Sequence, residues 1–296
     1  MNGKVKDAVL ALTRFIPDEL YLRMAYRSVT GKKLHLNPPV TYNEKLQWLK
    51  LHNRQPEYTL MVDKYEVRTF VAERVGEEYL VKTLGVWNRA EDIDFNALPN
   101  RFVLKCTHDC GGLVICRDKK ALDIEAAKKQ LNDCLKTNFF WQGREWPYKN
   151  VKPRIYAEEY LEDTGETQLS DYKVFCFDGV PQIIQVDYDR YEGHKRQFFD
   201  CDWNRMDISF HFLSDTVKQI RKPEVLSEML YLSRKLSTGF PHLRTDFYIV
   251  NNKLYVGEMT FFHGTGFGKW WPEGTDEWLG KFLNINNIKQ RGGGKI

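Results

Sequence analysis

The chain has 296 residues, enough for one large domain or for two to three smaller ones. Its 44 Lys and Arg against 40 Asp and Glu leave a net charge of +4, too balanced to indicate a nucleic-acid-binding surface. No apolar run reaches the ~18 residues that a membrane span needs, and the first residues do not resemble a secretion signal. We therefore expect a cytoplasmic protein whose six cysteines are reduced.

Helical patterns dominate the first part of the chain. Apolar residues recur at helical spacing through 4–28, and Pro17 with Asp18 divides this segment into two helices. Basic residues flank the apolar positions, so the segment either lies on a membrane surface or packs against its own domain. Thr41 and Glu44 form a capping box that predicts a helix from Tyr42, and Asp63 caps a further helix over 64–74.

Two strands with a small loop between them follow. Residues 102–106 and 113–116 are apolar and β-branched, and the loop 107–112 contains two glycines. Lys105 sits near the end of the first strand and must face a partner or a cleft, because burial of an unpaired ammonium is costly. Such a loop can close over phosphates with its backbone N–H groups. It is not a Walker A loop, which requires a following helix.

The same region raises a zinc alternative. It contains Cys106, His108, Cys110 and Cys116, although their spacing matches no C-x-x-C pair. The remaining chain alternates strand and helix patterns. We expect a helix over 124–140, a strand over 155–161, a strand and turn over 171–180, a strand over 182–186, and an amphipathic helix over 223–237. The basic cluster Arg190, His194, Lys195 and Arg196 is either a solvated loop or a site for an anionic substrate.

Residues 243–260 read as a β-hairpin around Asn251 and Asn252. A regular two-residue turn would place Asp246 opposite Gly257 and would send Glu258 to the other face. A three-residue loop, or a bulge at Gly257, would instead place Asp246 directly opposite Glu258. The two carboxylates would then form a hard oxygen site suited to Mg²⁺ held with nucleotide phosphates. The alternative is an ordinary hairpin with two solvated acids.

The order of these signals is similar to that of the TupA-like ATP-grasp family of surface-polysaccharide gene clusters. The resemblance covers nearly the whole chain and rests on the ranges 41–45, 63–65, 102–108, 171–173, 244–248, 258–260 and 279–280. It implies an α+β ATP-grasp fold in which two α+β subdomains clasp ATP. It also implies three regions: an N-terminal helical region (1–60), a pre-grasp and lid subdomain with the phosphate loop (61–160), and a C-terminal grasp subdomain with the Mg²⁺ site (161–296).

The resemblance also implies roles for individual residues. ATP would be bound by Lys64, Lys105, His108, Gly111 and Gly112 at its phosphates, by Glu158, Glu159, Tyr160 and Leu161 along the adenine hinge, and by Asp171 and Lys173. Mg²⁺ would be held by Asp246, Glu258 and Thr260. Arg244 would steady the acyl phosphate, and His263 would relay a proton from the amine. Arg190 and Arg196 would bind an anionic substrate. Two departures from the family pattern are Asp109 in the lid and Thr260 in place of Asn.

The implied activity is that of an ATP-dependent carboxylate–amine ligase that forms an amide through an acyl phosphate. Family context suggests that an amino acid or peptide amine is joined to a uronic acid of a bacterial surface polysaccharide. The aromatic residues of 139–148 and the pair Trp270 and Trp271 would either stack on sugar rings or serve as packing anchors. Three competing hypotheses are a ligase for amino acids or peptides, a glycosyltransferase, and a non-catalytic ATP-binding protein of polysaccharide assembly.

Overall fold

The computed structural model describes residues 13–109, 112–163, 169–189, 193–211, 218–286 and 288. Helices form the first part of this chain: α2 (Asp18–Thr30), α3 (Tyr42–His52), α4 (Glu57–Val62) and α5 (Val67–Val75). The expected capping box starts α3, because the Thr41 side chain accepts from the Glu44 N–H and the Glu44 carboxylate accepts from the Thr41 N–H. The first expected helix, over residues 4–16, lies largely outside the described residues.

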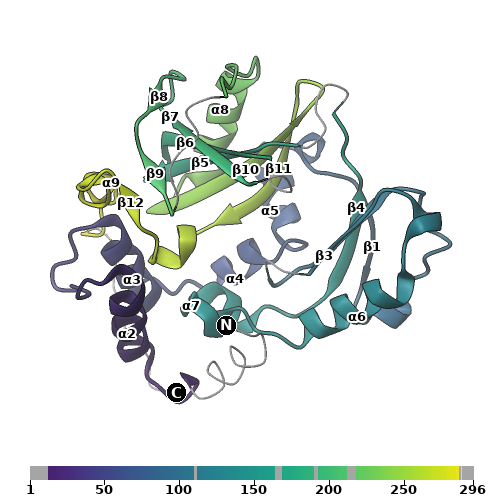
Figure 1. Ribbon diagram of the computed structural model, residues 1–296, viewed down its shortest axis with the longest axis horizontal. Coiled ribbons are helices and arrows are strands. Elements are labelled where there is room, and N and C mark those ends of the chain that lie inside the picture. The colour runs from purple at the N-terminus through teal and green to yellow at the C-terminus, as the bar shows by residue number, and fades with distance from the viewer. Residues whose placement is uncertain are drawn as a thin grey trace.

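A four-stranded antiparallel sheet follows in the order β1-β4-β2-β3. Its strands are β1 (Thr83–Trp87), β2 (Phe102–Cys106), β3 (Leu113–Cys116) and β4 (Ile155–Glu159). Helix α6 (Ile124–Leu135) lies along this sheet (Figure 1), and Leu131 packs with Leu104 and Ile155 in a core of its own. The expected helix 124–140 ends earlier, since Thr137 Oγ1 donates to the Cys134 carbonyl and Asn138 starts the short helix α7 (Phe140–Gly143).

A six-stranded antiparallel sheet has the order β11-β10-β5-β6-β7-β8. Its strands are β5 (Asp171–Phe177), β6 (Val180–Tyr188), β7 (Lys195–Phe199), β8 (Arg205–Met206), β10 (His242–Val250) and β11 (Lys253–Thr260). A short pair, β9 (Ser209–Phe210) with β12 (Trp270–Trp271), lies beside it. In Figure 1 the six-stranded sheet lies in the upper part of the molecule and the four-stranded sheet at the right, with α4 and α5 near the centre and α7 below them.

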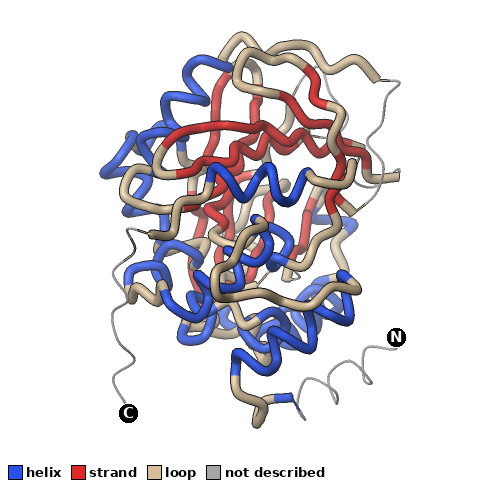
Figure 2. The backbone as a smooth tube through the Cα atoms, turned by 90° about the vertical axis from the view of Figure 1, so that its left-hand side faces the viewer, coloured by secondary structure: helices blue, strands red, loops and turns tan. Residues whose placement is uncertain are grey.

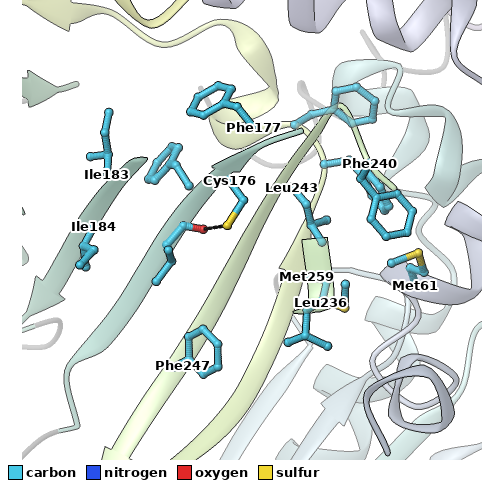
Figure 3. Close-up of a cluster of buried hydrophobic side chains, with 14 of the residues drawn as sticks. Met61, Cys176, Phe177, Ile183, Ile184, Leu236, Phe240, Leu243, Phe247 and Met259 are labelled. Atoms are coloured by element: carbon cyan, nitrogen blue, oxygen red, sulfur yellow. Dashed lines mark hydrogen bonds between the residues drawn. The ribbon is translucent and has the colours of Figure 1, made fainter. Parts of the chain in front are cut away.

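Strand alternation places Arg244, Asp246 and Tyr248 of β10 on one face of the six-stranded sheet, called the polar face below, and Leu243 and Phe247 on the other, called the apolar face. On the apolar face, Leu243 and Phe247 of β10 pack with Cys176 of β5, Leu236 of α8 (Leu226–Ser237) and Met61 of α4 (Figure 3). The cores of α4, α5 and the sheet therefore form one continuous cluster. Burying a side chain of this size contributes about 1.5–3 kcal/mol, so this cluster holds the sheet against the helices and leaves the polar face for chemistry.

Helix α3 connects the first part of the chain to the last. Lys45 Nζ donates to the carbonyls of Gly280 and Leu283 at 2.7 Å each, and these residues end α9 (Thr275–Phe282). The Asn43 side chain donates to the Gly268 carbonyl at 2.8 Å. Figure 2 shows the strands in the upper and central part of the molecule, with several helices below them.

The helix expected over 64–74 begins later, as α5 at Val67. Asp63 still caps this segment, since its Oδ1 accepts from the N–H groups of Tyr65 and Glu66 at 2.8 and 3.1 Å. The Lys64 N–H is used elsewhere, because it donates to the Thr107 carbonyl at 3.0 Å. The first turn is therefore drawn toward the loop after β2. Within the described residues, no helix combines the length and the apolar character that crossing a membrane requires.

Candidate nucleotide and metal site

The polar face of the six-stranded sheet carries the residues predicted to bind metal. Strand β10 places Arg244, Asp246 and Tyr248 on this face, while Leu243 and Phe247 point to the core. The register places Asp246 opposite Lys173 of β5 on one side and opposite Glu258 of β11 on the other. Side chains of directly paired residues share a face, so these three groups form one row across the sheet.

A bulge produces this row. Asn251 and Asn252 have φ values of 50° and 59°, as a tight two-residue turn requires, and Val250 pairs with Lys253. The register then shifts between Asp246 and Phe247, which leaves Gly257 as the extra residue. The bulge brings Glu258 back to the face of Asp246. The predicted alternative with a bulge at Gly257 is confirmed, and the three-residue loop is not formed.

Asp246 is the most strongly paired acid in the row. Arg244 donates to both of its oxygens at 2.7 Å, and Lys173 Nζ donates to Oδ2 at 2.8 Å. Burial would raise the pKa of the Asp246 carboxyl, but the charges of Arg244 and Lys173 outweigh it and hold the pKa below its usual range. Asp246 therefore stays ionised. Lys173 also lies 3.6 Å from Asp171 Oδ1, which places the predicted Asp171–Lys173 pair at the same site.

Asp187 of β6 belongs to the site, although nothing in the sequence analysis identified it. Arg196 donates to Asp187 Oδ1 from Nε at 2.6 Å, and Gln185 Nε2 donates to both oxygens at 3.0 Å. Burial raises the pKa of Asp187, but the hydrogen bond and the charge of Arg196 lower it by more, and the pKa falls to about 2. Lys173 Nζ lies 4.0 Å from Asp187 Oδ2. The polar alternation of Gln185 and Asp187 in an otherwise apolar strand was the available signal.

Glu258 differs from its neighbours because its carboxylate has no partner within the part of the chain that the structure describes. It is half-buried, and no described residue forms an ion pair or a side-chain hydrogen bond with it. Thr260 Oγ1 accepts from Arg244 NH2 at 3.0 Å. An open carboxylate opposite an ionised one is the donor chemistry that a hard divalent cation prefers, so the residues fit Mg²⁺. In this set the Glu258 carboxylate is the ligand that is free to bind a cation. Asp246 and Thr260 lie beside it, and both accept hydrogen bonds from Arg244.

His263 lies at the edge of the row, in the turn His263–Gly266 that follows β11. Its Nδ1 is 2.6 Å from Arg244 NH1. An arginine only donates, so Nδ1 is the acceptor and the ring proton is on Nε2. That Nε2 is buried and has no partner within the described residues. Burial and then Arg244 lower the pKa of His263 well below 6.5, so the ring is neutral and presents an N–H donor.

The four-stranded sheet supplies the predicted nucleotide side. Lys105 of β2 forms an ion pair with Glu158 of β4, and the Tyr156 hydroxyl donates to Glu158 Oε2 at 3.0 Å. Strand alternation turns Glu159 the other way, where it is exposed and pairs with Lys82 at 3.3 Å. Glu158 therefore faces inward with Lys105, and a phosphate at Lys105 would compete with this carboxylate. Tyr160 and Leu161 follow the end of β4.

The segment after β4 meets the metal hairpin. Asp163 Oδ2 accepts from the Asn251 N–H at 3.1 Å. Burial raises the pKa of Tyr156, the charge of Glu158 raises it further, and Tyr248 on the polar face of β10 adds to the same effect. Two segments far apart in the sequence are thus neighbours, and the predicted nucleotide residues lie toward the predicted metal residues.

Lys64 and the lid loop are joined directly. Lys64 Nζ donates to the Asp109 carbonyl oxygen. The Asp109 carboxylate accepts from the Gly112 N–H at 3.1 Å and from Cys134 Sγ at 2.6 Å. The acid that departs from the family pattern is therefore held by its own loop and by α6. His108 is buried with Nε2 3.2 Å from the Cys134 carbonyl oxygen. Gly111 lies outside the described residues.

The structure does not assemble the four residues of the zinc alternative. Cys116 pairs with Phe102 in the register of β2 and β3, four positions away from Cys106, and Cys110 lies outside the described residues. The described ligand atoms that do gather within 4.8 Å of one another belong to Cys106, Asp109 and Cys134. The hydrogen bond with Cys106 raises the pKa of the Cys134 thiol most, and burial and the neighbouring Asp109 raise it further. The thiol is therefore protonated.

Three of the aromatic residues considered for sugar stacking are packing anchors. Phe140, Tyr148 and Trp270 lie in the main core. Trp271 is 38% exposed and is the more accessible of the pair. Of the two arginines predicted to bind substrate, Arg196 is buried and held by Asp187, and Arg190 lies outside the described residues.

Several solved structures are similar to parts of this chain at low sequence identity. The chain matches solved structures of D-alanine–D-alanine ligase from Bacillus anthracis complexed with ATP (13% identity, 68% of this chain, 54% of that chain, TM-score 0.38) and of L-amino acid ligase from Bacillus licheniformis (13%, 85%, 57%, 0.48). A third is N5-carboxyaminoimidazole synthetase from Staphylococcus aureus complexed with ADP (15%, 68%, 44%, 0.42). The chain spans about half the length of these proteins. No curated protein matches it.

The family comparison is decisive for the fold. The model of the TupA-like ATP-grasp family matches residues 44–284, which include α3, both larger sheets and the metal hairpin. The predicted α+β ATP-grasp fold is thereby confirmed. The chain belongs to the TupA-like ATP-grasp family.

Proposed function

We propose that the protein is an ATP-dependent ligase that joins a carboxylate to an amine and releases ADP and phosphate. The observation that carries the proposal is the row of charged side chains on the sheet. Glu258 lies opposite Asp246, and Lys173 and Arg244 donate hydrogen bonds to Asp246. Membership of an ATP-grasp family supports it. The reaction needs no side-chain nucleophile, because the substrate carboxylate itself attacks ATP.

The reaction would have two steps. An oxygen of the acid substrate attacks the γ-phosphorus, the bond to the ADP oxygen breaks, and its electron pair leaves with ADP. The amine nitrogen, as the free base, then attacks the acyl carbon, the bond to the phosphate oxygen breaks with its electron pair leaving on phosphate, and the nitrogen gives its proton to that phosphate. Transition-state charge in such transfers is spread over phosphoryl oxygens, so positioned cations supply most of the catalysis.

Each of these cations comes from a different element. Lys105 and Lys64 would bind the phosphates, with the loop 107–112 closing over them. Lys173 and Arg244 would keep the carboxylate of Asp246 ionised and would place positive charge beside the transferred group. Mg²⁺ held by Glu258, with Asp246 and Thr260 beside it, would offset the charge of the ATP phosphates. The adenine would lie along Glu158 to Leu161.

The substrates are proposed at the level of chemical class. The acid would be a uronic acid of a bacterial surface polysaccharide, and the amine would belong to an amino acid or a peptide. The resemblance to a family of surface-polysaccharide gene clusters supports this choice. Assembly would take place in the cytoplasm, where ATP is supplied, with the basic N-terminal segment as the candidate for contact with a lipid-linked glycan.

The decisive measurement is ADP release with Mg²⁺-ATP across a matrix of uronic acids and amines. The wild-type protein is compared with the double variant Asp246→Asn, Glu258→Gln. ADP formed only when acid and amine are both present, and reduced at least about 100-fold in the variant, is the expected result. ATP binding without ADP formation in any combination would contradict a ligase. Turnover of a sugar nucleotide without ATP would replace it with a glycosyltransferase.

The variant Glu125→Gln serves as the control. Glu125 lies on α6, and its side chain is 85% exposed. Its activity should equal that of the wild type. Unfolding midpoints of both variants would show that the loss of activity in the double variant is not a loss of fold.

A further inference from the structure

Glu145 is a buried acid that lies outside every predicted role. It follows α7 and precedes the turn Trp146–Asn150. Its residue is 3% exposed, and no described residue donates a side-chain hydrogen bond to it or forms an ion pair with it. Buried carboxylates are normally paired, because an isolated buried charge is costly. An unpaired one therefore marks a position where a partner arrives from outside the protein.

The nearest cation cannot be that partner. Lys50 of α3 donates to the Gln47 side-chain oxygen at 3.0 Å, to the Gly143 carbonyl at 2.6 Å and to the Thr265 carbonyl at 2.7 Å. An ammonium group has three N–H donors, so all of them are used by neutral oxygens. Lys50 lends Glu145 its charge through space but no hydrogen bond. The acceptor capacity of the Glu145 carboxylate stays free.

Glu145 also lies toward the reacting groups. Its Oε1 is 3.5 Å from the position that a Cβ on Gly143 would take, and the same position is 3.0 Å from Thr265. Thr265 belongs to the turn that carries His263, whose Nδ1 accepts from Arg244. The pKa of Glu145 is raised to about 7, because burial raises it by more than the charges of Lys50 and Arg244 lower it, and the charge of Glu258 raises it as well. The charge of Glu258 on β11 therefore reaches Glu145, which lies on a different segment of the chain.

Two free carboxylates near each other create a negative potential that attracts a cation. Glu258 is on the metal hairpin, beside the ionised Asp246. Glu145 is on a separate segment and is accompanied by Lys50, an arrangement with too little net charge for a second metal ion. A protonated amine requires less negative charge than a metal ion. One carboxylate that accepts its N–H is enough, provided that the acyl group forms nearby. Charge-assisted hydrogen bonds of this kind are about twice as strong as neutral ones.

We propose that Glu145 binds the ammonium group of the amine substrate, accepts the proton that frees the nitrogen lone pair, and holds the nitrogen beside the acyl group formed at the hairpin. This inference rests on the proposed ligase function and deepens it. It names the residue that would recognise the positive charge of the amino acid or peptide amine, which neither the family nor the sequence motifs specify. His263 has a different part, since its Nε2–H is a donor and is suited to an oxygen of the acyl or phosphoryl group.

The test compares wild type, Glu145→Gln, Glu145→Asp and the control Glu125→Gln. The amine is varied at saturating ATP and acid. We expect Glu145→Gln to raise the KM for the amine about 10- to 100-fold, the range for loss of a charge-assisted hydrogen bond. The KM values for ATP and the acid should stay unchanged. Glu145→Asp keeps the charge on a shorter side chain and should fall between wild type and Glu145→Gln.

Hydroxylamine separates amine binding from acyl phosphate formation. It is uncharged at neutral pH and traps an acyl phosphate as a hydroxamate without an ammonium site. Glu145→Gln should therefore form hydroxamate at the wild-type rate. If it instead loses hydroxamate formation, or if its affinity for Mg²⁺-ATP falls, Glu145 belongs to the metal or phosphate machinery and the proposal is overturned.

Two further outcomes distinguish a failure of the role of Glu145 from a failure of the proposed ligase function. An unchanged KM for the amine in Glu145→Gln would overturn the role of Glu145 and leave the ligase intact. A wild-type protein that forms neither ADP nor hydroxamate with any acid would overturn both proposals together. The unfolding midpoint of each variant is measured alongside. If Glu145→Gln does not fold, the KM for the amine in Glu145→Asp decides, and a value equal to that of wild type overturns the proposal.

Discussion

Replacing Asp187 with Asn should destabilise the protein strongly at neutral pH and less in acid. In the folded protein the pKa of Asp187 is about 2, below the ordinary value of 3.8. A shift of that size corresponds to about 2 kcal/mol of stability at pH 7. The variant also leaves the buried Arg196 without its carboxylate, and breaking a buried ion pair costs about 3–5 kcal/mol. We therefore expect a loss of about 2–5 kcal/mol in the free energy of unfolding.

The sign of the pH dependence follows from the direction of the shift. A carboxyl group with a lowered pKa stabilises the folded state above its unfolded pKa, and this contribution disappears as pH falls through the folded pKa. The difference between wild type and Asp187→Asn should thus be constant above about pH 5. It should shrink between about pH 4 and about pH 2, with roughly half of the 2 kcal/mol gone near pH 3.

Urea unfolding at several pH values measures this difference. Asp207→Asn is the matched control, because Asp207 is exposed and should give the wild-type curve at every pH. A difference below about 1 kcal/mol at pH 7 would refute the reasoning, since even the pKa shift alone requires more. So would a large difference that does not change between pH 7 and pH 3, because the lost stability would then not come from the charge of Asp187.

Three other substitutions probe separate parts of the structure. In Gly257→Ala the new Cβ would lie 2.8 Å from the Tyr248 ring, so the free energy of unfolding should fall by about 1–3 kcal/mol in a urea titration, and an unchanged value would contradict the bulge. Thr41→Ala removes the capping box of α3 and should cost about 1 kcal/mol by thermal unfolding, whereas Thr41→Ser should restore it. Lys105→Met should weaken ATP binding by calorimetry at least about tenfold; equal affinity would remove Lys105 from the phosphate site.

The hairpin was predictable because its signals are local. Asn251 and Asn252 announce the turn, and the parity of a strand limits the ways in which Asp246 and Glu258 can meet. The sequence did not decide between a longer loop and a bulge at Gly257. Both satisfy the parity, and the choice depends on how β11 packs on its neighbours.

The missed residues depend on partners that are distant in the chain. Asp187 and Glu145 look like ordinary acids of a strand and a loop. Asp187 belongs to the site because β7 places Arg196 directly opposite it. Glu145 has no hydrogen-bond donor among the described residues, since Lys50, 93 residues before Gly143, already donates to other oxygens. No spacing rule reports either fact, since each follows from which groups the tertiary fold has already used.

The contacts of α3 have a consequence for synthesis. Lys45 lies 235 residues before the Gly280 carbonyl that it binds, and Gln47 lies 219 residues before the Gly266 carbonyl to which it donates at 2.7 Å. On the ribosome α3 emerges long before these acceptors exist, so its polar side chains stay hydrated until α9 has been made. A nascent chain stalled before Thr275 would hold Asp246, Glu258 and Lys173 and still lack the Gly280 and Leu283 carbonyls to which Lys45 donates. The site should therefore close late in translation, when the helices made first finally meet the last strands and helix.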